Sequence, residues 1–333
     1  MTDWGIYGGS GFIGQHLAYS IISRNPEDKV HLLDIQSPED AGWKAPLEQF
    51  LSTGRLSFLK TDVRDRAQLS SNARDFNVIV NLAAIHREPG HRPEEYFETN
   101  VTGAENVCHL ADCISCSEII FTSSIAVYGV HDREVDEHSV VEPKSPYGQS
   151  KYTAEKIHRK WAKKTAGRLV IIRPGVVFGP GENGNVTRLV REILRLGRPI
   201  RVSPDQPKAG IYIEELLEVI HWLREQPLQD EECLLVNGVS NENITFNAYG
   251  NVLQKIKEFE KRPLIVSEPM IRFTTTLMKP LGLVLPAGSK IHPERLAKLI
   301  LANNVKPAEL VAKEYPYSWP LHRALTHWLE KGL

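Results

Sequence analysis

The chain has 333 residues, of which 41% are hydrophobic and 24% charged, and its formal net charge at pH 7 is -1. This length fits one large α/β unit or two domains that share a cleft, and the composition supports a folded core rather than disorder. The near balance of charge argues against a nucleic-acid binder, which needs a concentrated basic surface. The sequence also lacks a run of the roughly 20 apolar residues that a membrane-spanning helix requires.

The N-terminus and the cysteines indicate a cytoplasmic protein. Residues 2–9 have the pattern of an opening strand and not of a signal peptide. Cys113 and Cys116 form a C-x-x-C, but no further Cys or His follows at zinc-ligand spacing. We therefore expect these two cysteines to be structural and the chain to bind no metal. Few cysteines and no export signal favour a reducing compartment.

The first half of the chain alternates strand-like and helix-like segments. The strand-like segments are apolar on both faces, as in a buried parallel sheet, and they span residues 4–8, 29–34, 56–62, 77–84, 118–124 and 168–175. Helical patterns lie between them, at 13–24, 66–75 and 147–164. The alternation predicts an α/β fold, a Rossmann-type doubly wound parallel sheet that binds ligands at the carboxyl ends of its strands.

After residue 174 the pattern becomes irregular. Helices are predicted at 186–197, 213–225 and 246–260, and single strands at 232–238 and 263–268. We therefore predict a Rossmann domain over 1–174 and a smaller mixed α/β substrate-binding lobe over 175–333, with segments that can interleave.

A glycine cluster marks the turn between the first strand and the first helix. Gly8, Gly11 and Gly14 lie there, and such glycines let the backbone approach a pyrophosphate at the helix N-terminus. Asp34 ends the second strand, where a carboxylate can accept hydrogen bonds from ribose hydroxyls. A strand-end acid or a helix cap is the plain alternative for Asp34. Because no arginine adjoins Asp34 to hold a 2′-phosphate, the pattern favours NAD over NADP.

With these features the chain resembles the extended short-chain dehydrogenase/reductase superfamily, in its NAD-dependent sugar epimerase/dehydratase branch. The resemblance covers almost the whole chain and rests on GGSGFIG, TDVRD, NLAA, ETNVTGAENV, TSSIAVYG, YGQSK and RPGVVFGPG, in that order. It implies that Asp62 and Val63 meet the adenine, and that the segment from Asn81 lies along the cofactor. The residues assigned to the cofactor are Gly8, Gly11, Phe12, Ile13, Gly14, Asp34, Asp62, Val63, Leu82, Ala83, Ala84, Tyr147, Lys151 and Pro174.

Two Tyr-x-x-x-Lys pairs follow each other, Tyr147 with Lys151 and Tyr152 with Lys156. They cannot both face the cofactor, because five residues correspond to about 140° of helix rotation. Tyr147 follows a proline at a plausible helix start and lies in the family's YGxSK context, so we assign Tyr152 to packing.

The predicted chemistry explains the first pair. An ammonium one turn away, together with the positive charge of an oxidised nicotinamide, favours the phenolate and lowers the pKa of Tyr147 toward the working range. By alignment of the S-x-x-V-Y-G ending, Ser124 completes a catalytic triad with Tyr147 and Lys151. Its neighbour Ser123 is the alternative.

This triad predicts oxidation of a substrate hydroxyl to a ketone. Return of the hydride to the other face makes an epimerase, release of the ketone makes a dehydrogenase, and the reverse reaction makes a reductase. The resemblance disfavours a dehydratase, because Ile125 and Ala126 follow Ser124 where that branch has an acid/base pair. An NAD-binding scaffold without turnover and a steroid-type dehydrogenase are further alternatives.

The resemblance implies a diphosphate-linked sugar as substrate. It assigns Asn185 and Lys208 to the diphosphate, and His86, beside Arg87, to the pocket entrance with Ser124. A helix cap is the alternative for Asn185 and a plain wall residue for His86. Lys208 replaces the family's usual arginine, so the diphosphate is held differently.

Several features match enzymes of bacterial surface polysaccharides. We predict a 4-epimerase of a UDP-hexose or UDP-N-acetylhexosamine that acts through a transient 4-keto intermediate. The alternatives are an NAD(P)H-dependent 4-keto-sugar reductase and a 4-epimerase of polyprenyl-diphosphate-linked GlcNAc. A lipid-linked substrate would bring the protein to the inner face of the membrane, where the apolar segment 270–286 could make a peripheral contact. Core packing is its alternative. The resemblance also implies a homodimer through the helices over 94–112 and 147–164.

Overall fold

The structure is a computed structural model of the whole chain. It describes residues 1–41, 47–88, 90–131, 133–228, 233–270, 273, 276 and 303–332. Most of the apolar segment 270–286 therefore lies outside the described residues. Within the described ranges, no helix is both long enough and apolar enough to cross a membrane.

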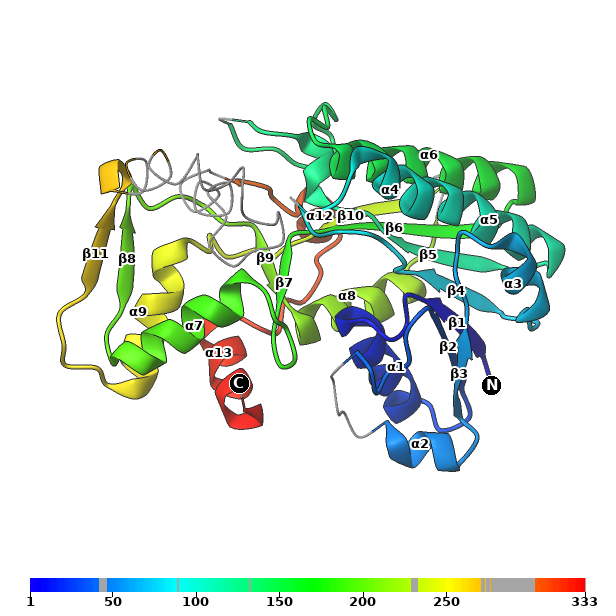
Figure 1. Cartoon of the computed structure of the whole chain (residues 1–333), viewed down its shortest axis with the longest axis horizontal. Helices are drawn as coiled ribbons and strands as arrows, with labels where there is room; N and C mark the ends of the chain where they lie inside the picture. Colours follow the sequence, from blue (N-terminus) through cyan, green and yellow to red (C-terminus); the bar gives the residue numbers. More distant parts are fainter. Residues whose placement is uncertain are drawn as a thin grey trace.

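A seven-stranded parallel sheet forms the centre of the larger part of the molecule (Figure 1). Its strand order is β10-β6-β5-β4-β1-β2-β3. The chain thus moves outward from β1 to β3 and then returns to the other side of β1. The strands are β1 (Asp3–Tyr7), β2 (Lys29–Asp34), β3 (Leu56–Lys60), β4 (Val78–Asn81), β5 (Glu118–Thr122), β6 (Arg168–Pro174) and β10 (Leu234–Gly238).

The strand register brings the carboxyl ends of the central strands to one edge. Tyr7 lies opposite Leu33 on β2 and opposite Asn81 on β4. The strand order reverses between β1 and β4, and this is where doubly wound sheets bind their ligands. The predicted fold class is confirmed, and the segments following β1, β2, β4 and β5 are those that carry the predicted motifs.

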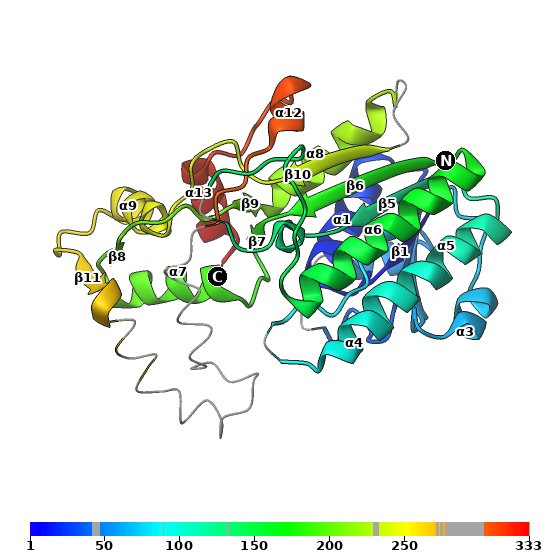
Figure 2. The same ribbon diagram turned by 90° about the horizontal axis from the view of Figure 1, so that it is seen from above.

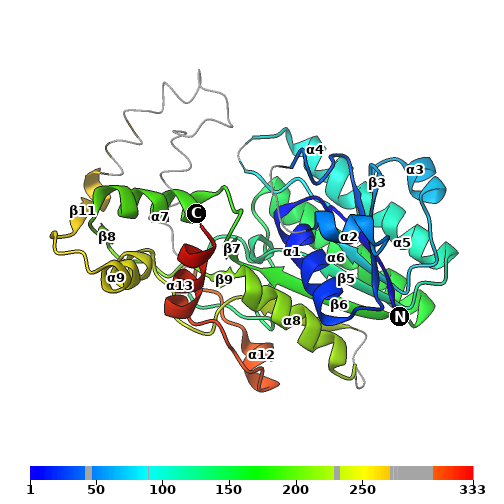
Figure 3. The ribbon, with the colours of Figure 1, turned by 90° about the horizontal axis from the view of Figure 1, so that it is seen from below.

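Helices cover both faces of the sheet, so its strands are buried on both sides. Figures 2 and 3 show the two layers from opposite sides. One layer holds α1 (Phe12–Arg24), α2 (Glu48–Ser52) and α8 (Ile213–Glu225). The other holds α3 (Arg66–Ser71), α4 (Pro93–Phe97), α5 (Gly103–Cys113) and α6 (Pro146–Thr165). Between α4 and α5 the helix widens into one π-helical segment, η1 (Glu98–Thr102), which the sequence did not predict.

The second lobe lies beyond the carboxyl ends of the central strands, on the side where β6 continues into the second half of the chain (Figures 1 and 2). It contains two small parallel pairs, β7 (Val176–Phe178) with β9 (Gly210–Tyr212), and β8 (Ile200–Ser203) with β11 (Leu264–Ser267). Around them lie α7 (Asn185–Leu196), α9 (Phe246–Lys257) and α13 (Leu321–Lys331), whereas α12 (Ala308–Ala312) contacts β10 of the central sheet. Aromatic rings join these elements, and Phe178 contacts Tyr212, Tyr249 and Trp328 with ring centroids 5.5 to 6.0 Å apart.

The predicted helices and strands are found close to their expected bounds, with α3 and β4 shorter than expected. Strand β10 pairs with β6, so the central sheet takes one strand from beyond residue 174. Segments of the two predicted domains thus interleave, while the division at residue 174 itself stays a prediction.

Candidate active site

The glycine turn packs the first strand tightly against its neighbours. Gly8 has a φ of +74°, in the region that favours glycine, and its N–H donates to the Leu33 carbonyl at 2.8 Å. A Cβ at Gly8 would lie 2.7 Å from the Ala83 nitrogen, and one at Gly14 would lie 2.6 Å from the Gly9 carbonyl oxygen. Side chains at these positions would push the turn, α1 and the segment after β4 apart.

The N-terminus of α1 faces the turn without a side-chain cap. Gly11 is its N-cap and is exposed, and Phe12 and Ile13 in the first turn are half-buried. Among the described residues, the buried Ser10 hydroxyl has no hydrogen-bond partner. Open N–H groups at a helix N-terminus and a buried hydroxyl without a partner suit a phosphate.

Asp34 stands at the end of β2 beside this turn. Its carboxylate accepts hydrogen bonds from the backbone N–H of Ser10 at 3.1 Å and of Gln36 at 3.3 Å. Partial burial raises the pKa of Asp34, and these backbone donors oppose the rise. The Asp34 carboxylate is thus held beside the glycine turn and the N-terminus of α1, which together form the glycine cradle.

The segment after β4 is fixed by a buried asparagine in the π-helix. Asn100 is 3% exposed, and its side chain binds both the N–H and the carbonyl of Ile85, at 2.9 and 3.1 Å. Its amide also donates to Ser150 at 2.9 Å, and Ser150 donates to the Tyr147 carbonyl at 2.8 Å. The half-buried residues Leu82, Ala83 and Ala84 precede this clamp, so the helix of Tyr147 and the predicted cofactor wall are held together.

The three predicted catalytic side chains meet at the same edge of the sheet. Ser124 follows β5 and caps the 3-10 turn η2 (Ile125–Tyr128), and its hydroxyl accepts from the Ala126 N–H at 3.1 Å. Tyr147 is half-buried in the first turn of α6, and its hydroxyl interacts with that of Ser124. Lys151 lies one turn further and is 2% exposed, with its Nζ 4.5 Å from the centroid of the Phe121 ring.

Burial shifts both titratable groups of the triad toward their neutral forms. It raises the pKa of Tyr147 to about 12, although Ser124 opposes the rise. It lowers the pKa of Lys151 to about 7, although Glu155 opposes the fall. The protein alone therefore does not produce the lowered tyrosine pKa that the sequence predicted. That prediction included the charge of an oxidised nicotinamide, and it stays a prediction.

Three other residues assigned to the cofactor make contacts within the protein. Asp62 is held by Arg64 through bonds of 2.9 and 2.6 Å, which lower the pKa of Asp62. Val63 is buried under α5, where a Cβ at Gly103 would lie 2.8 Å from its Cγ2. Pro174 is buried at the end of β6. Their roles toward the cofactor stay predictions.

The predicted substrate residues lie on different parts of the fold. His86 is exposed after β4, within electrostatic reach of Lys151. Asn185 is exposed at the start of α7, and its side-chain oxygen accepts from Arg188 at 3.4 Å. Lys208 lies in the loop before β9, and burial lowers its pKa to about 8.

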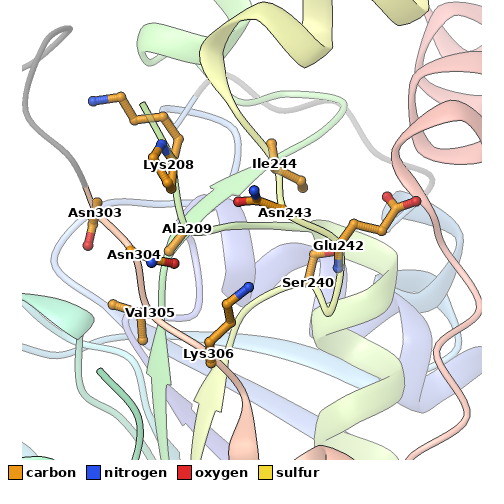
Figure 4. Close-up of a pocket in the computed structure, with 11 residues that line it drawn as sticks. Lys208, Ala209, Ser240, Glu242, Asn243, Ile244, Asn303, Asn304, Val305 and Lys306 are labelled. Carbon is orange, nitrogen blue, oxygen red and sulfur yellow. The ribbon is translucent and has the colours of Figure 1, made fainter. Parts of the chain in front are cut away.

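A small polar pocket adjoins Lys208. Its walls come from the segments 207–209, 240–244 and 303–306 (Figure 4). The Lys208 side chain extends away from the other labelled side chains, and the Lys306 ammonium points toward the turn at Ser240. The backbone of this loop is fixed, because the Lys208 N–H donates to Ile244 and the Ala209 N–H to Asn303.

Comparison with known proteins gives the family. The model of the NAD dependent epimerase/dehydratase family matches residues 4–236, which include the glycine turn, the triad and the central sheet except Asp3 of β1 and the last two residues of β10. The chain belongs to this family. It is therefore an NAD-dependent enzyme of the extended short-chain dehydrogenase/reductase type, as the order of its motifs predicted.

Individual relatives are consistent with this assignment. An N-acetyl-alpha-D-glucosaminyl-diphospho-ditrans,octacis-undecaprenol 4-epimerase of Escherichia coli O157:H7 is 40% identical over 134 residues, a match that covers 40% of each chain. An uncharacterized UDP-glucose epimerase of Bacillus subtilis (strain 168) is 25% identical over 72% of this chain and 78% of its own. The UDP-glucuronic acid 4-epimerase of Bacillus cereus, solved with UDP-glucuronic acid and NAD, shares the fold with a TM-score of 0.73, at 18% identity over 98% of each chain.

The residues of the cradle fit the cofactor of the family. The glycine turn and the open N-terminus of α1 suit a pyrophosphate, and Asp34 suits a ribose without a 2′-phosphate.

Beyond the predicted set, the structure adds Tyr96 on α4, which is 2% exposed. Its hydroxyl donates to the Arg87 carbonyl at 2.6 Å, and its ring lies 6.2 Å from that of Tyr147. Only the fold brings it to the site, since 51 positions separate the two tyrosines (147 minus 96).

Proposed function

We propose that this chain is an NAD-dependent epimerase of a diphosphate-linked sugar, acting at C4 of a UDP-hexose or UDP-N-acetylhexosamine. The observation that carries the proposal is the meeting of Ser124, Tyr147 and Lys151 beside the glycine cradle of an NAD-dependent family. A reversible oxidation of one hydroxyl to a ketone is the chemistry that these residue types support.

Each member of the triad has a distinct task in this proposal. When bound, NAD supplies the hydride acceptor and donor. Tyr147 takes the proton of the sugar hydroxyl as the ketone forms, and returns it when the hydroxyl is restored. Ser124 hydrogen-bonds the same oxygen and steadies it while it loses and regains the proton. The Lys151 ammonium stabilises the phenolate and holds the ribose hydroxyls near it.

The side chains after Ser124 support epimerisation over dehydration. Elimination of water needs a further acid and base at the sugar ring. Ile125 has no titratable group and is 7% exposed, in an apolar cluster with Val239 and Val305. The position after Ser124 thus holds a buried apolar side chain, Ile125, where dehydration would need an acid or a base.

The relatives support the substrate class. One acts on a sugar that a diphosphate joins to a polyprenol, and others are named for UDP-glucose. The shared feature is a hexose on a diphosphate, which Lys208 and Asn185 are suited to bind by charge and hydrogen bonding. We therefore keep polyprenyl-diphosphate-linked GlcNAc as the second candidate substrate of the same reaction.

The test is direct conversion. Purified protein is incubated with NAD and, separately, with UDP-glucose, UDP-GlcNAc and polyprenyl-diphosphate GlcNAc, and the sugars are analysed by NMR. We expect the 4-epimer to appear with one of them, without net change in NADH absorbance. The proposal fails if every sugar is recovered unchanged while the Tyr152→Phe variant and the wild type both bind NADH.

A reductase would behave differently in the same assay. Supplied with a 4-keto sugar, it would consume NADH or NADPH in proportion to the product formed. An epimerase returns its hydride within each turnover and consumes none. Consumption of NADH or NADPH in proportion to the product, with no conversion of UDP-glucose, UDP-GlcNAc or polyprenyl-diphosphate GlcNAc, would therefore identify the protein as the reductase and not the epimerase.

For assembly we propose a homodimer through the helices over 94–112 and 147–164. Phe97 on α4 is 37% exposed on this face. A shallow hollow beside it is lined by Pro93, Glu94, Phe97, Glu98, Val101, Thr102 and Glu105. Light scattering should give twice the chain mass for the wild type and a monomer for Phe97→Glu. The control is Val311→Glu, at a site on α12 that is 48% exposed, and it should stay a dimer. A Phe97→Glu dimer would contradict the proposal.

For localisation we propose a cytoplasmic enzyme that touches the inner face of the membrane. Ile265, on β11 at the end of the second lobe (Figure 1), is 65% exposed, and Phe273 is 71% exposed; both are large apolar side chains. Flotation with phosphatidylglycerol vesicles should carry the wild type, and the Ile265→Glu/Phe273→Glu variant should stay in solution. Equal behaviour of the two proteins would remove the membrane contact from the proposal.

A further inference from the structure

A buried ion pair lies one helical turn beyond the catalytic lysine. Glu155 on α6 and Arg173 on β6 have side chains that are 1% and 3% exposed. The Arg173 Nε donates to one carboxylate oxygen at 2.9 Å, and a terminal nitrogen donates to the other at 2.7 Å. Such a two-bond pair is strong and fixes the orientation of both groups. Neither residue belongs to the cradle or to the triad.

Glu155 has a second cation within reach. Lys151 precedes it by four residues, so the two side chains lie on the same face of α6, at a spacing that commonly gives a direct ion pair. The Glu155 charge acts on Lys151, because it opposes the fall that burial causes in the lysine pKa. Yet both Glu155 oxygens are bonded to Arg173, and the Lys151 Nζ lies over the Phe121 ring on β5.

Arg173 is itself held in place. Its remaining terminal nitrogen donates to the Tyr128 hydroxyl at 2.9 Å, and its guanidinium lies 5.0 Å from the centroid of that ring. The Tyr128 hydroxyl in turn donates to the Asn237 side chain at 2.9 Å, at the end of β10. The guanidinium is therefore fixed between α6, the turn after Ser124 and the edge of the sheet, and cannot turn away from Glu155 without breaking these bonds.

We propose that Arg173 is a positioning residue for Lys151. By holding both oxygens of Glu155, it keeps this carboxylate from drawing the lysine ammonium along the helix into a direct ion pair. The ammonium then stays over the Phe121 ring, where the proposed function needs it for Tyr147 and the cofactor. The inference rests on the same site as the proposed function and adds the residue that decides where the charge of Lys151 lies.

The other titratable groups that face Lys151 do not compete with Glu155 for it. His158 on α6 stacks on Phe121 at 4.1 Å, and burial lowers its pKa to about 4, so it is neutral near pH 7. His86, after β4, acts on Lys151 only by repulsion, and only when His86 is protonated. Tyr147 is neutral in the protein alone, so Glu155 is the anion whose partner decides the position of the ammonium.

The experiment measures binding of NADH by fluorescence from about pH 6 to about pH 9, a range in which a buried lysine loses its charge. The proteins are the wild type, Arg173→Met, Glu155→Gln and the double variant. In Arg173→Met the ammonium pairs with Glu155, so we expect affinity near neutral pH to fall about tenfold, as for a lost charge-assisted hydrogen bond. The midpoint of the alkaline loss of binding should rise by about one pH unit, since the carboxylate now stabilises the charged lysine.

The double variant should show the opposite shift. Without the carboxylate, its midpoint and that of Glu155→Gln should lie below the wild-type midpoint, and affinity at the acid end should return to within about threefold of the wild type. If Arg173→Met does not fold, the lower midpoints of Glu155→Gln and the double variant carry the test.

Arg224→Met is the matched control. It removes a bond of 3.0 Å to the buried carboxylate of Glu118, at the opposite end of the strands, and should lower the melting temperature without moving the midpoint. A purely structural pair would give this same result for Arg173 and Glu155. Unchanged midpoints in all the folded variants, or a double-variant midpoint at or above that of the wild type, would overturn the inference. NADH binding reports on Lys151 whichever sugar the enzyme uses, so this failure is distinct from failure of the proposed function.

Discussion

Helix α6 carries two Tyr-Lys pairs of identical spacing in different surroundings. In the first, Lys151 is 2% exposed and its Nζ lies over the Phe121 ring, while Tyr147 faces Ser124. In the second, Lys156 is exposed and its Nζ lies 4.3 Å from the centroid of its own partner, the Tyr152 ring. Tyr152 packs against the apolar cluster that contains Ile125, so its assignment to packing is confirmed.

The difference shows that spacing alone does not define a catalytic pair. Burial gives the first pair unusual protonation, because it disfavours the charge on Lys151 and on Tyr147 alike. A bound oxidised cofactor and a substrate hydroxyl would change that balance. The two pairs therefore provide matched variants on one helix.

The largest effect is expected at the catalytic phenol. Tyr147→Phe removes the proton acceptor and should lower kcat by about 10³-fold, within the usual range for a lost general base. Tyr152→Phe should keep kcat within about threefold of the wild type, because the ring and its packing remain. Both rates are measured with the sugar that the conversion assay identifies, on proteins shown to bind NADH. Near-normal turnover by Tyr147→Phe would refute the assignment of the triad.

The two lysines should differ in how stability depends on pH. The pKa of Lys151 is lowered by burial from 10.5 to about 7, so the unfolded chain binds more protons than the folded one between these values. Stability of the wild type therefore gains from this group as the pH rises through that window. Lys151→Met lacks the gain, and its free energy of unfolding relative to the wild type should fall by about 1 kcal/mol or more from about pH 7 to about pH 10.

The control for this prediction is Lys156→Met. Its side chain is exposed, so the difference from the wild type should stay level over the same range. Denaturant unfolding at several pH values gives both differences. Parallel curves for the two variants would mean that Lys151 keeps its ordinary pKa in the folded protein.

Two glycines have similar backbone angles but different surroundings. Gly8 has a φ of +74° and Gly54 a φ of +70°, but only at Gly8 would a Cβ meet other atoms within 4 Å. Alanine at either site should cost about 1 kcal/mol of backbone strain. Gly8→Ala should in addition weaken NADH binding by about tenfold or more, because the cradle must open. Fluorescence titration distinguishes them, and equal affinities would place the cofactor away from the turn.

The sequence allowed most of the sheet and the cradle to be predicted. Strands such as β5 are buried on both faces and so appear as continuous apolar runs, and the glycines are required locally by a turn and a close approach. The choice between Ser123 and Ser124 also came from a local pattern, and the structure places Ser124 beside Tyr147.

Long-range contacts were not predictable in this way. Glu155 and Arg173 lie on a helix and on the strand that follows it. Arg173 reaches Glu155 and the Tyr128 hydroxyl only in the folded chain. The pKa shifts of Tyr147 and Lys151 follow from burial, which depends on packing from several elements. The predicted substrate residues Asn185 and Lys208 rest on family patterns in the irregular second half, where neither periodicity nor a turn fixes a side chain.

The smallest predicted effect is therefore at Lys208, and it tests the second lobe. Burial lowers the pKa of Lys208 to about 8, so its charge declines just above neutral pH. If this charge holds the diphosphate, Lys208→Met should raise KM by about fivefold to tenfold with kcat nearly unchanged, the effect of one partly screened charge pair. Lys208→Arg keeps the charge at higher pH and should remove the alkaline rise in KM. Steady-state kinetics at several pH values checks both, and an unchanged KM in Lys208→Met would assign diphosphate binding to other residues of the lobe.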